Sequence, residues 1–275
     1  MTDSQDNLVY LYGIIPAASA DPDELLSGLD NRPVRVLRVG RIAAVVSDVP
    51  ADTYGDDALN GRLDDLAWVG GRGMEHERVL DWFVERGAVL PLSLFSIHRD
   101  EERVRQRLRS DEAEYERSLQ KLAGRREWGI KLWRNETRVI AGIDQLSASL
   151  QVLNAEIESA PPGRKFLMER KREAMRTEEV RALSGRIAHD IYSALRESAD
   201  DAVNMRLPGG LSATERTLLL HAAYLVQDDG FTGFQVAVTE QAATLAGSGY
   251  ELEFTGPWPP YNFTGDDVDD DDAAG

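Results

Sequence analysis

The most regular hydrophobic pattern of the chain lies near its C-terminal end. Residues 217–227 form a nearly unbroken apolar run, which is typical of a strand buried on both faces. Apolar residues then recur at helical intervals over 231–245, with Thr232 and Gln235 spaced as a capping box. Residues 250–255 alternate between apolar and acidic, which predicts a half-exposed strand. Strand, helix and strand with short connections indicate a layered arrangement of helices on a sheet.

The first third of the chain predicts strands followed by helices. Residues 8–15 are apolar and rich in β-formers, so we expect a buried strand. Residues 34–39 and 42–48 flank a Gly-Arg pair that favours a two-residue hairpin. A helix is predicted over 75–86, and a strand over 88–95, whose proline favours a sheet edge.

Helices follow these strands, and they complete the first predicted domain. Asp100 can cap a helix whose apolar positions continue to Leu122. We therefore predict an α+β N-terminal domain over residues 1–124.

The remaining pattern predicts a second domain at 125–263, joined to the first by helices. Strands are expected at 128–134 and 202–207, with helical segments at 144–160 and 164–199 between them. Together with the elements at its end, the domain has the order βαββαβ, which is typical of a ferredoxin-like fold with 217–227 placed centrally. The fold class is thus α+β, with two α/β-type domains. The acidic residues 264–275 are predicted to be a disordered tail.

Composition restricts the classes of partner. The formal net charge of −17 disfavours nucleic acid and anionic membranes as partners. Four of the 31 basic residues are lysines, and this arginine-rich, carboxylate-dense balance suits a halophilic source; an ordinary acidic protein is the alternative. No apolar stretch approaches the ~20 residues of a membrane span, and the polar start does not resemble a signal peptide, so we expect a cytoplasmic protein.

Candidate chemistry is sparse. Cysteine is absent, and the four histidines show no metal-ligand spacing. We interpret His76 as exposed helix polarity and His221 as a core histidine. The glycines at 70, 71 and 73 lack the rest of a phosphate loop and indicate a flexible linker. We therefore predict no catalytic, cofactor-binding or metal-binding residues, and an enzyme that uses carboxylates is the less favoured alternative.

Two segments suggest contacts with other proteins. Arginines are dense between 164 and 186, which indicates a solvated helix face or, less often, a contact for an acidic partner. Residues 255–263 read Thr-Gly-Pro-Trp-Pro-Pro-Tyr-Asn-Phe, and their prolines predict a turn or polyproline conformation instead of strand. The aromatics of this segment either pack on their own domain or form a docking surface. The candidate partner-binding residues are Pro257, Trp258, Pro259, Pro260, Tyr261 and Phe263.

Five segments in this order resemble the gas vesicle protein F/L family. They are residues 11–16, 40–47, 89–92, 127–131 and 255–263, of which the last is the most specific. The length and the acidic tail are similar to those of the haloarchaeal L-type member.

The resemblance implies a non-enzymatic accessory, minor structural protein of gas vesicles with two α/β domains, the second a variant ferredoxin-like fold. It implies binding to the hydrophobic shell protein and to other accessory gas vesicle proteins, at the gas vesicle or in the cytoplasm, and no cofactor. A generic acidic protein-interaction module of a halophile is the alternative from outside this family.

Overall fold

The structure is a computed structural model that describes residues 7–19, 21–22, 26–207, 212–213 and 216–264. The predicted tail at 264–275 lies outside these residues, apart from Thr264. The chain divides into two compact units, one containing Met1–Glu127 with Trp258–Gly275 and the other containing Trp128–Pro257. The predicted boundary placed 258–263 in the second domain, whereas in the structure this segment returns to the first unit.

The first unit is built on a five-stranded sheet in which β1 is internal. The strands that pair with β1 all run antiparallel to it. The predicted hairpin between β2 and β3 is confirmed, with Val39 opposite Ile42 and Gly40 at a φ of 56°. The order is β2-β3-β1-β4, and β5 also pairs with β1. The strands are β1 (Asn7–Pro16), β2 (Arg35–Val39), β3 (Ile42–Pro50), β4 (Leu90–Pro91) and β5 (Ile97–His98).

A bulge in β1 changes which side chains enter the core of this unit. The register against β3 shifts between Leu11 and Gly13. In a regular strand, side chains alternate between the two faces of the sheet, so Ile15 would lie on the face opposite Tyr10 and Tyr12. The extra residue at the bulge reverses this order, and Ile15 joins Tyr10 and Tyr12 in one buried cluster. The same cluster holds the apolar face of α3.

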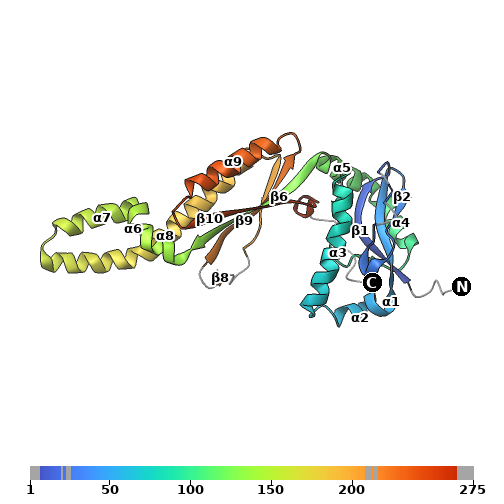
Figure 1. The fold of residues 1–275 in the computed structure, drawn as a ribbon, viewed down its shortest axis with the longest axis horizontal. Coiled ribbons are helices and arrows are strands. Elements are labelled where there is room, and N and C mark those ends of the chain that lie inside the picture. The colour runs from blue at the N-terminus through green and yellow to red at the C-terminus, as the bar shows by residue number, and fades with distance from the viewer. Residues whose placement is uncertain (1–6, 20, 23–25, 208–211, 214–215, 265–275) are drawn as a thin grey trace. The chain divides into compact units, whose positions relative to one another are not determined.

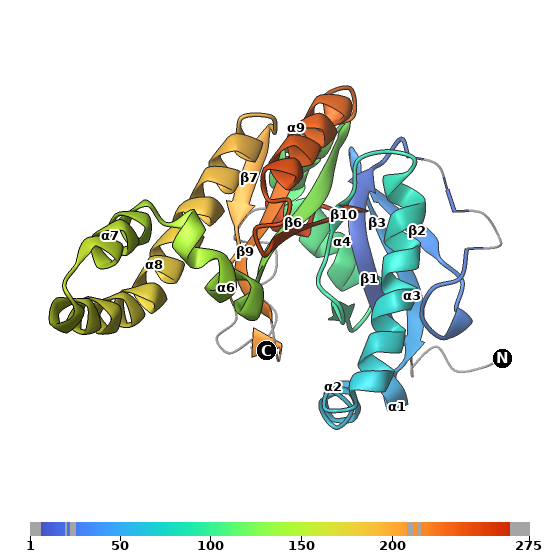
Figure 2. The same ribbon diagram turned by 60° about the vertical axis from the view of Figure 1, so that its left-hand side comes forward.

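Helices cover both faces of this sheet, α3 on one side and α4 with α5 on the other (Figures 1 and 2). Asp65 caps α3 by accepting from the backbone N–H groups of Ala67 and Trp68, and the predicted Asp100 cap of α4 is confirmed. Short 3-10 turns lie at Leu29–Asn31 and Tyr261–Phe263. The helices are α1 (Ala51–Tyr54), α2 (Asp56–Asn60), α3 (Leu66–Val84), α4 (Glu101–Ser110) and α5 (Glu112–Leu122).

Two predictions in this unit were wrong. The helix predicted over 75–86 begins at Leu66, so the glycines at 70, 71 and 73 lie inside α3 and are not a linker. Each helical glycine costs about 1 kcal/mol, which the burial of Val79 and Phe83 on the same helix outweighs. The strand predicted over 88–95 is reduced to Leu90–Pro91, and Phe95 has a φ of 69°, which ends any extended run.

The second unit holds another five-stranded sheet, with the order β10-β6-β9-β7. The apolar run at 217–227 is confirmed as an internal strand, β9. Its burial on both faces holds only from Ala222 to Val226, because exposure alternates over its first half. The strands are β6 (Arg125–Asn135), β7 (Asp201–Asn204), β8 (Ser212–Ala213), β9 (Arg216–Gln227) and β10 (Tyr250–Trp258).

The helices of this unit differ from the prediction at their ends. The segment at 144–160 forms parts of two helices, which Ser147 separates by accepting from the backbone N–H of Leu150. The capping box predicted at Thr232 is wrong, since α9 begins at Phe231 after Gly230 without a side-chain cap. The helices are α6 (Glu136–Leu146), α7 (Ala148–Ser159), α8 (Pro162–Arg196) and α9 (Phe231–Thr244).

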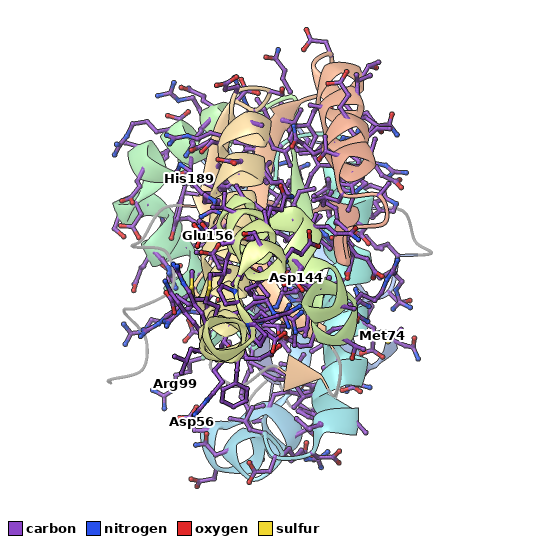
Figure 3. The ribbon with its side chains drawn as sticks, turned by 90° about the vertical axis from the view of Figure 1, so that its left-hand side faces the viewer. Asp56, Met74, Arg99, Asp144, Glu156 and His189 are labelled. Carbon is purple, nitrogen blue, oxygen red and sulfur yellow. The ribbon has the colours of Figure 1, made fainter. Side chains whose placement is uncertain are left out.

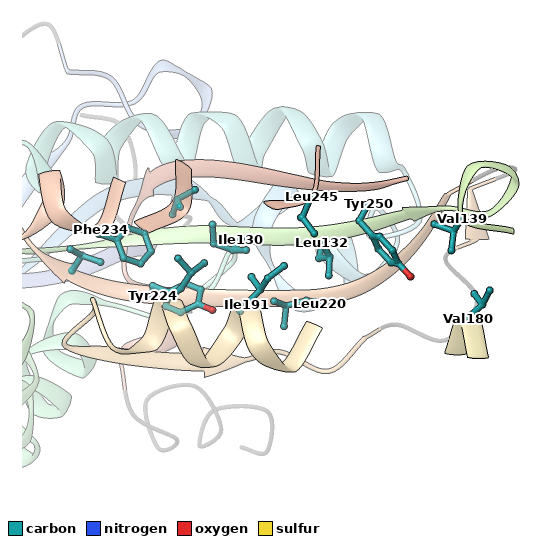
Figure 4. Close-up of a cluster of buried hydrophobic side chains, with 14 of the residues drawn as sticks. Ile130, Leu132, Val139, Val180, Ile191, Leu220, Tyr224, Phe234, Leu245 and Tyr250 are labelled. Atoms are coloured by element: carbon teal, nitrogen blue, oxygen red, sulfur yellow. The ribbon is translucent and has the colours of Figure 1, made fainter. Parts of the chain in front are cut away.

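The long helix α8 has two halves with different environments. Its second half packs on the sheet, where Ile191 meets Leu220 and Tyr224 of β9 and Ile130 of β6 (Figure 4). Its first half forms a hairpin with α7 that extends beyond the sheet (Figures 1 and 2). This hairpin buries Leu150, Leu153 and Ile157 of α7, and the Arg172 guanidinium adds a hydrogen bond to Asn154 Oδ1 at 3.3 Å.

Candidate functional site

The closing proline-aromatic segment continues a strand as far as Trp258, contrary to the prediction of a turn or polyproline conformation, whereas the predicted turn is confirmed at Tyr261–Phe263. Strand β10 includes Pro257 and ends at Trp258. It lies at one edge of its sheet, and an edge strand tolerates a residue that has no backbone N–H to donate. The Gly256–Pro257 peptide bond is cis.

The structure separates the six predicted partner-binding residues into exposed and buried groups. Pro257 is exposed, and Trp258 is 47% exposed. Pro259, Pro260 and Phe263 are buried, and the hydroxyl group of the half-buried Tyr261 donates a hydrogen bond to Glu77 Oε1 at 2.7 Å. Most of this segment therefore packs on its own unit, and Trp258 is the aromatic side chain that it presents to solvent.

Trp258 forms one wall of a groove, called the α3 groove below. Its volume is about 810 Å³, and its lining is mainly apolar. The positions that α3 contributes recur at helical spacing on the face opposite its buried side chains, and Met74 among them is 77% exposed (Figure 3). The lining residues are Leu26, Gly73, Met74, Glu77, Arg78, Asp81, Trp82, Glu85 and Trp258.

A stripe of carboxylates follows the groove along α3. Glu77, Asp81 and Glu85 lie four residues apart and therefore on one face of the helix. Burial raises the pKa of Glu77, against the hydrogen bond from Tyr261, which lowers it. Burial also raises the pKa of Asp81, and the negative charge of Glu85 adds to this shift. The groove thus combines apolar walls with a row of three carboxylates.

Two arginines, Arg78 and Arg86, lie at or beside the groove. The Arg78 guanidinium donates to the backbone oxygen of Ser27 at 3.0 Å. Arg86 lies over the Trp82 ring, 3.8 Å from its centroid, and donates to the Trp82 backbone oxygen at 2.7 Å. It also forms an ion pair with Glu85, at 3.3 Å from Oε2. These contacts leave the carboxylate of Asp81 open to a cation supplied from outside.

The interpretation of His76 as exposed helix polarity was wrong. Its side chain is 1% exposed, on the side of α3 that faces the sheet, and its Nδ1 lies 2.7 Å from the Tyr10 hydroxyl. Burial lowers the pKa of His76 to about 4. The helical spacing from His76 to Val79, Leu80 and Phe83 is the sequence signal that identifies this position.

His221, in contrast, is not the core histidine that the apolar run predicts. It is half-buried on the first half of β9, where burial lowers its pKa and the nearby Lys131 adds to the effect. In this half of β9 alternate side chains are less buried, and His221 is one of these, so it lies on the less covered face of the sheet.

Among the described residues, no group of three or more histidine, aspartate or glutamate side chains is arranged to hold a metal ion. The α3 groove brings carboxylates close to aromatic rings, while His76 lies on the opposite side of the same helix. This arrangement suits recognition of an apolar and basic surface, since apolar walls supply burial and the carboxylates supply charge.

The comparison with protein families identifies the chain. Residues 8–265 match the family described as gas vesicle synthesis protein GvpL/GvpF, which covers the strands of both units and every lining residue of the groove. The chain belongs to the GvpL/GvpF family. This is a family of gas vesicle proteins and not a known enzyme family.

Individual GvpL/GvpF proteins resemble the chain over nearly its whole length. Gas vesicle protein L of a Streptomyces species is 29% identical, with 99% of each chain covered. Gas vesicle protein L1 of Halobacterium salinarum is 25% identical, with 94% of this chain and 90% of the relative covered. These relatives support a role in gas vesicle formation.

A solved structure shows the same fold. The crystal structure of the gas vesicle protein GvpF from an Anabaena species matches with a TM-score of 0.67 and 19% identity, covering 94% of this chain and 96% of that one. The fold is therefore the GvpF fold of mixed helices and sheets. In the part of the chain that the structure describes, no helix is both long enough and apolar enough to cross a membrane.

Proposed function

We propose that this chain is an accessory, minor structural protein of gas vesicle assembly that binds the hydrophobic shell protein and other accessory gas vesicle proteins. The observation that carries the proposal is the family match over residues 8–265, which includes both units and the α3 groove. On this proposal the protein is not an enzyme, and it acts in the cytoplasm and at the gas vesicle.

The α3 groove is the surface that we assign to the shell protein. A subunit with one very apolar face aggregates readily before it reaches its place in an assembly. A strongly charged partner with a small apolar surface can cover that face and keep the complex in solution. Trp258, Trp82 and Met74 supply such a surface on a chain with a net charge of −17.

Trp258 is the residue of the groove whose contribution is easiest to test. It is 47% exposed, and large aromatic side chains in apolar pockets commonly dominate the binding energy of an interface. Its replacement removes a wall of the groove without removing any of the buried side chains that follow it in the chain. We expect Trp258→Ala to weaken binding of the shell protein while the chain stays folded.

The experiment is co-purification of the shell protein with the tagged full-length chain. The expected result is recovery with the wild type and a loss of about tenfold or more with Trp258→Ala. Val236→Ala is the matched control, because Val236 is 52% exposed on α9, outside the groove. Equal recovery with Trp258→Ala rejects the groove as the site, and no recovery with the wild type rejects shell-protein binding. Deletion of the gene tests the wider role, with loss of vesicles as the expected result.

We also propose that residues 128–257 form a variant of the ferredoxin-like fold. The strand order β10-β6-β9-β7 supports this, because the strands of a βαββαβ unit then lie in the order four, one, three, two. The additional hairpin of α7 with α8 is the variation on that arrangement.

A further inference from the structure

The beginning of α8 carries exposed apolar side chains between basic ones. Residues 162–171, called the α8 tip below, lie at the start of the helix, where Phe166 is 60% and Leu167 is 66% exposed. Arg170 and Lys171 follow them one helical turn later and therefore lie beside them on the same face. Large apolar side chains exposed as a pair among charges are typical of a binding surface.

The charge of the α8 tip is opposite to that of the whole chain. The chain has a net charge of −17, yet residues 164–172 contain five basic residues and one acidic residue. No ion pair within the described residues involves Arg164, Lys165, Arg170 or Lys171. The first turn of α8 has no acidic residue, although the helix dipole favours acidic side chains there. A sequence that departs from such a local rule commonly does so for function.

The α3 groove has the complementary properties. Its walls include Trp82 and Trp258, and Glu77, Asp81 and Glu85 place one carboxylate on each successive turn of α3. From Met74 to Glu85 the groove follows about 16 Å of helix, enough for roughly three turns of a second helix. An amphipathic helix that binds in a groove presents residues at this spacing.

We propose that the α8 tip of one copy of this chain docks in the α3 groove of a second copy. Phe166 and Leu167 enter between the tryptophans, and Arg170 and Lys171 lie against the carboxylates of α3. When the shell protein does not occupy the groove, a second copy is the occupant that the chain itself supplies, because every copy carries both the basic, apolar tip and the acidic, apolar groove. The two surfaces differ, so the contact is head-to-tail, and a row of copies keeps one tip available at one end and one groove available at the other.

The test uses the purified full-length chain and measures its mass in solution at about 10–100 µM, the range in which weak self-association is visible. The wild type is expected to form dimers and longer species as its concentration rises. Arg170→Glu with Lys171→Glu makes the tip acidic, and Asp81→Arg with Glu85→Arg makes the groove basic. Each double variant alone is expected to associate about tenfold or more weakly, because like charges then face each other.

An equimolar mixture of the two double variants provides the decisive measurement. In this mixture the acidic tip meets a basic groove, and the unchanged basic tip meets an unchanged acidic groove, so association is expected to return. A wild type that is monomeric throughout this concentration range overturns the proposal. A mixture that stays monomeric overturns the pairing of these two surfaces, as does either variant associating as strongly as the wild type.

A third variant controls for net charge. Asp229→Arg with Glu197→Arg changes the charge of the chain as much as the groove variant does, at exposed positions of the second unit outside both surfaces. It is expected to associate like the wild type. Circular dichroism of all variants checks that they stay folded. The shell protein is absent from these measurements, so failure of this proposal leaves the proposed function unaffected.

Discussion

Asn262 donates two hydrogen bonds to the carboxylate of Glu127, from its backbone N–H to Oε2 at 3.0 Å and from Nδ2 to Oε1 at 2.6 Å. Glu127 is 5% exposed, at the end of the first long segment of its unit, and Asn262 belongs to the segment that returns from the second unit. Burial raises the pKa of Glu127, and these two hydrogen bonds oppose that shift. The pair therefore attaches the returning segment and stabilises a buried carboxylate.

Asn262→Ala is expected to lower the free energy of unfolding of the first unit by about 1–3 kcal/mol, because a buried carboxylate loses a hydrogen bond. The loss is expected to be larger at pH 8 than at pH 4, since the ionised carboxylate depends on the donor more strongly than the neutral carboxyl group does, and burial raises the pKa of Glu127 above its ordinary value of 4.5. Chemical denaturation at both pH values measures this difference. Asn60→Ala, at an exposed position of α2, is the control. An equal loss at the two pH values would contradict this role of Asn262.

The buried His76 predicts that stability decreases as the pH falls below 6.5. Its pKa falls from 6.5 to about 4 on folding, so between these values the unfolded chain binds a proton that the folded chain does not. His76 therefore does not reduce the free energy of unfolding above pH 6.5, where it is neutral in both states. As the pH falls to 4, it lowers the free energy of unfolding by about 3 kcal/mol. Stability of the wild type is therefore expected to fall more steeply over this interval than that of His76→Gln.

His189→Gln is the matched control for this measurement, because His189 is exposed on α8 (Figure 3). This variant is expected to keep the wild-type slope. If the stability of His76→Gln depended on pH as steeply as that of the wild type, His76 would not be neutral in the folded chain.

Two glycine substitutions are expected to have opposite effects. An added Cβ at Gly71 meets no atom within 4 Å, so Gly71→Ala is expected to stabilise α3 by about 0.5–1 kcal/mol. An added Cβ at Gly28 overlaps the Tyr12 hydroxyl and lies 2.6 Å from Ser47 Oγ. Gly28→Ala is therefore expected to destabilise the first unit by about 1–3 kcal/mol. Thermal unfolding of both variants measures the difference, and a destabilised Gly71→Ala would mean that α3 requires the glycine.

Salt is expected to stabilise the chain. Its charge of −17 opposes the compact state by self-repulsion, which salt screens. The expected result is a melting temperature more than about 5 °C higher in multimolar than in dilute salt. Equal melting temperatures in the two solutions would reject the prediction of a halophilic source.

The sequence predicted those elements whose structure is determined locally. The apolar run of β9, the hairpin at Gly40 and the Asp100 cap each depend on neighbouring residues, and all three are present. The start of α3 was missed because its glycines have low helix propensity, and burial of the rest of the helix overrides this preference. The strand at Pro257 was missed because the proline lies at a sheet edge, which propensity alone does not reveal.

The α3 groove was only partly predictable. Trp258 was predicted to contact a partner, and it is one wall of the groove. The rest of the lining comes from Leu26 and from the exposed face of α3, residues distant in sequence that only the fold brings together. Tyr261 and Phe263 were given equal weight with Trp258, because the aromatic pattern alone does not distinguish a side chain that packs inward from one that does not.

The return of the chain at Trp258 makes the second unit an insertion within the first. The polypeptide crosses between the units twice, once after Glu127 and once before Trp258. A protease that cuts at one crossing therefore leaves the two units covalently connected through the other. It also follows that the first unit can be produced alone only by splicing Glu127 to Trp258, whereas the second unit is one continuous stretch of chain that a single gene fragment encodes.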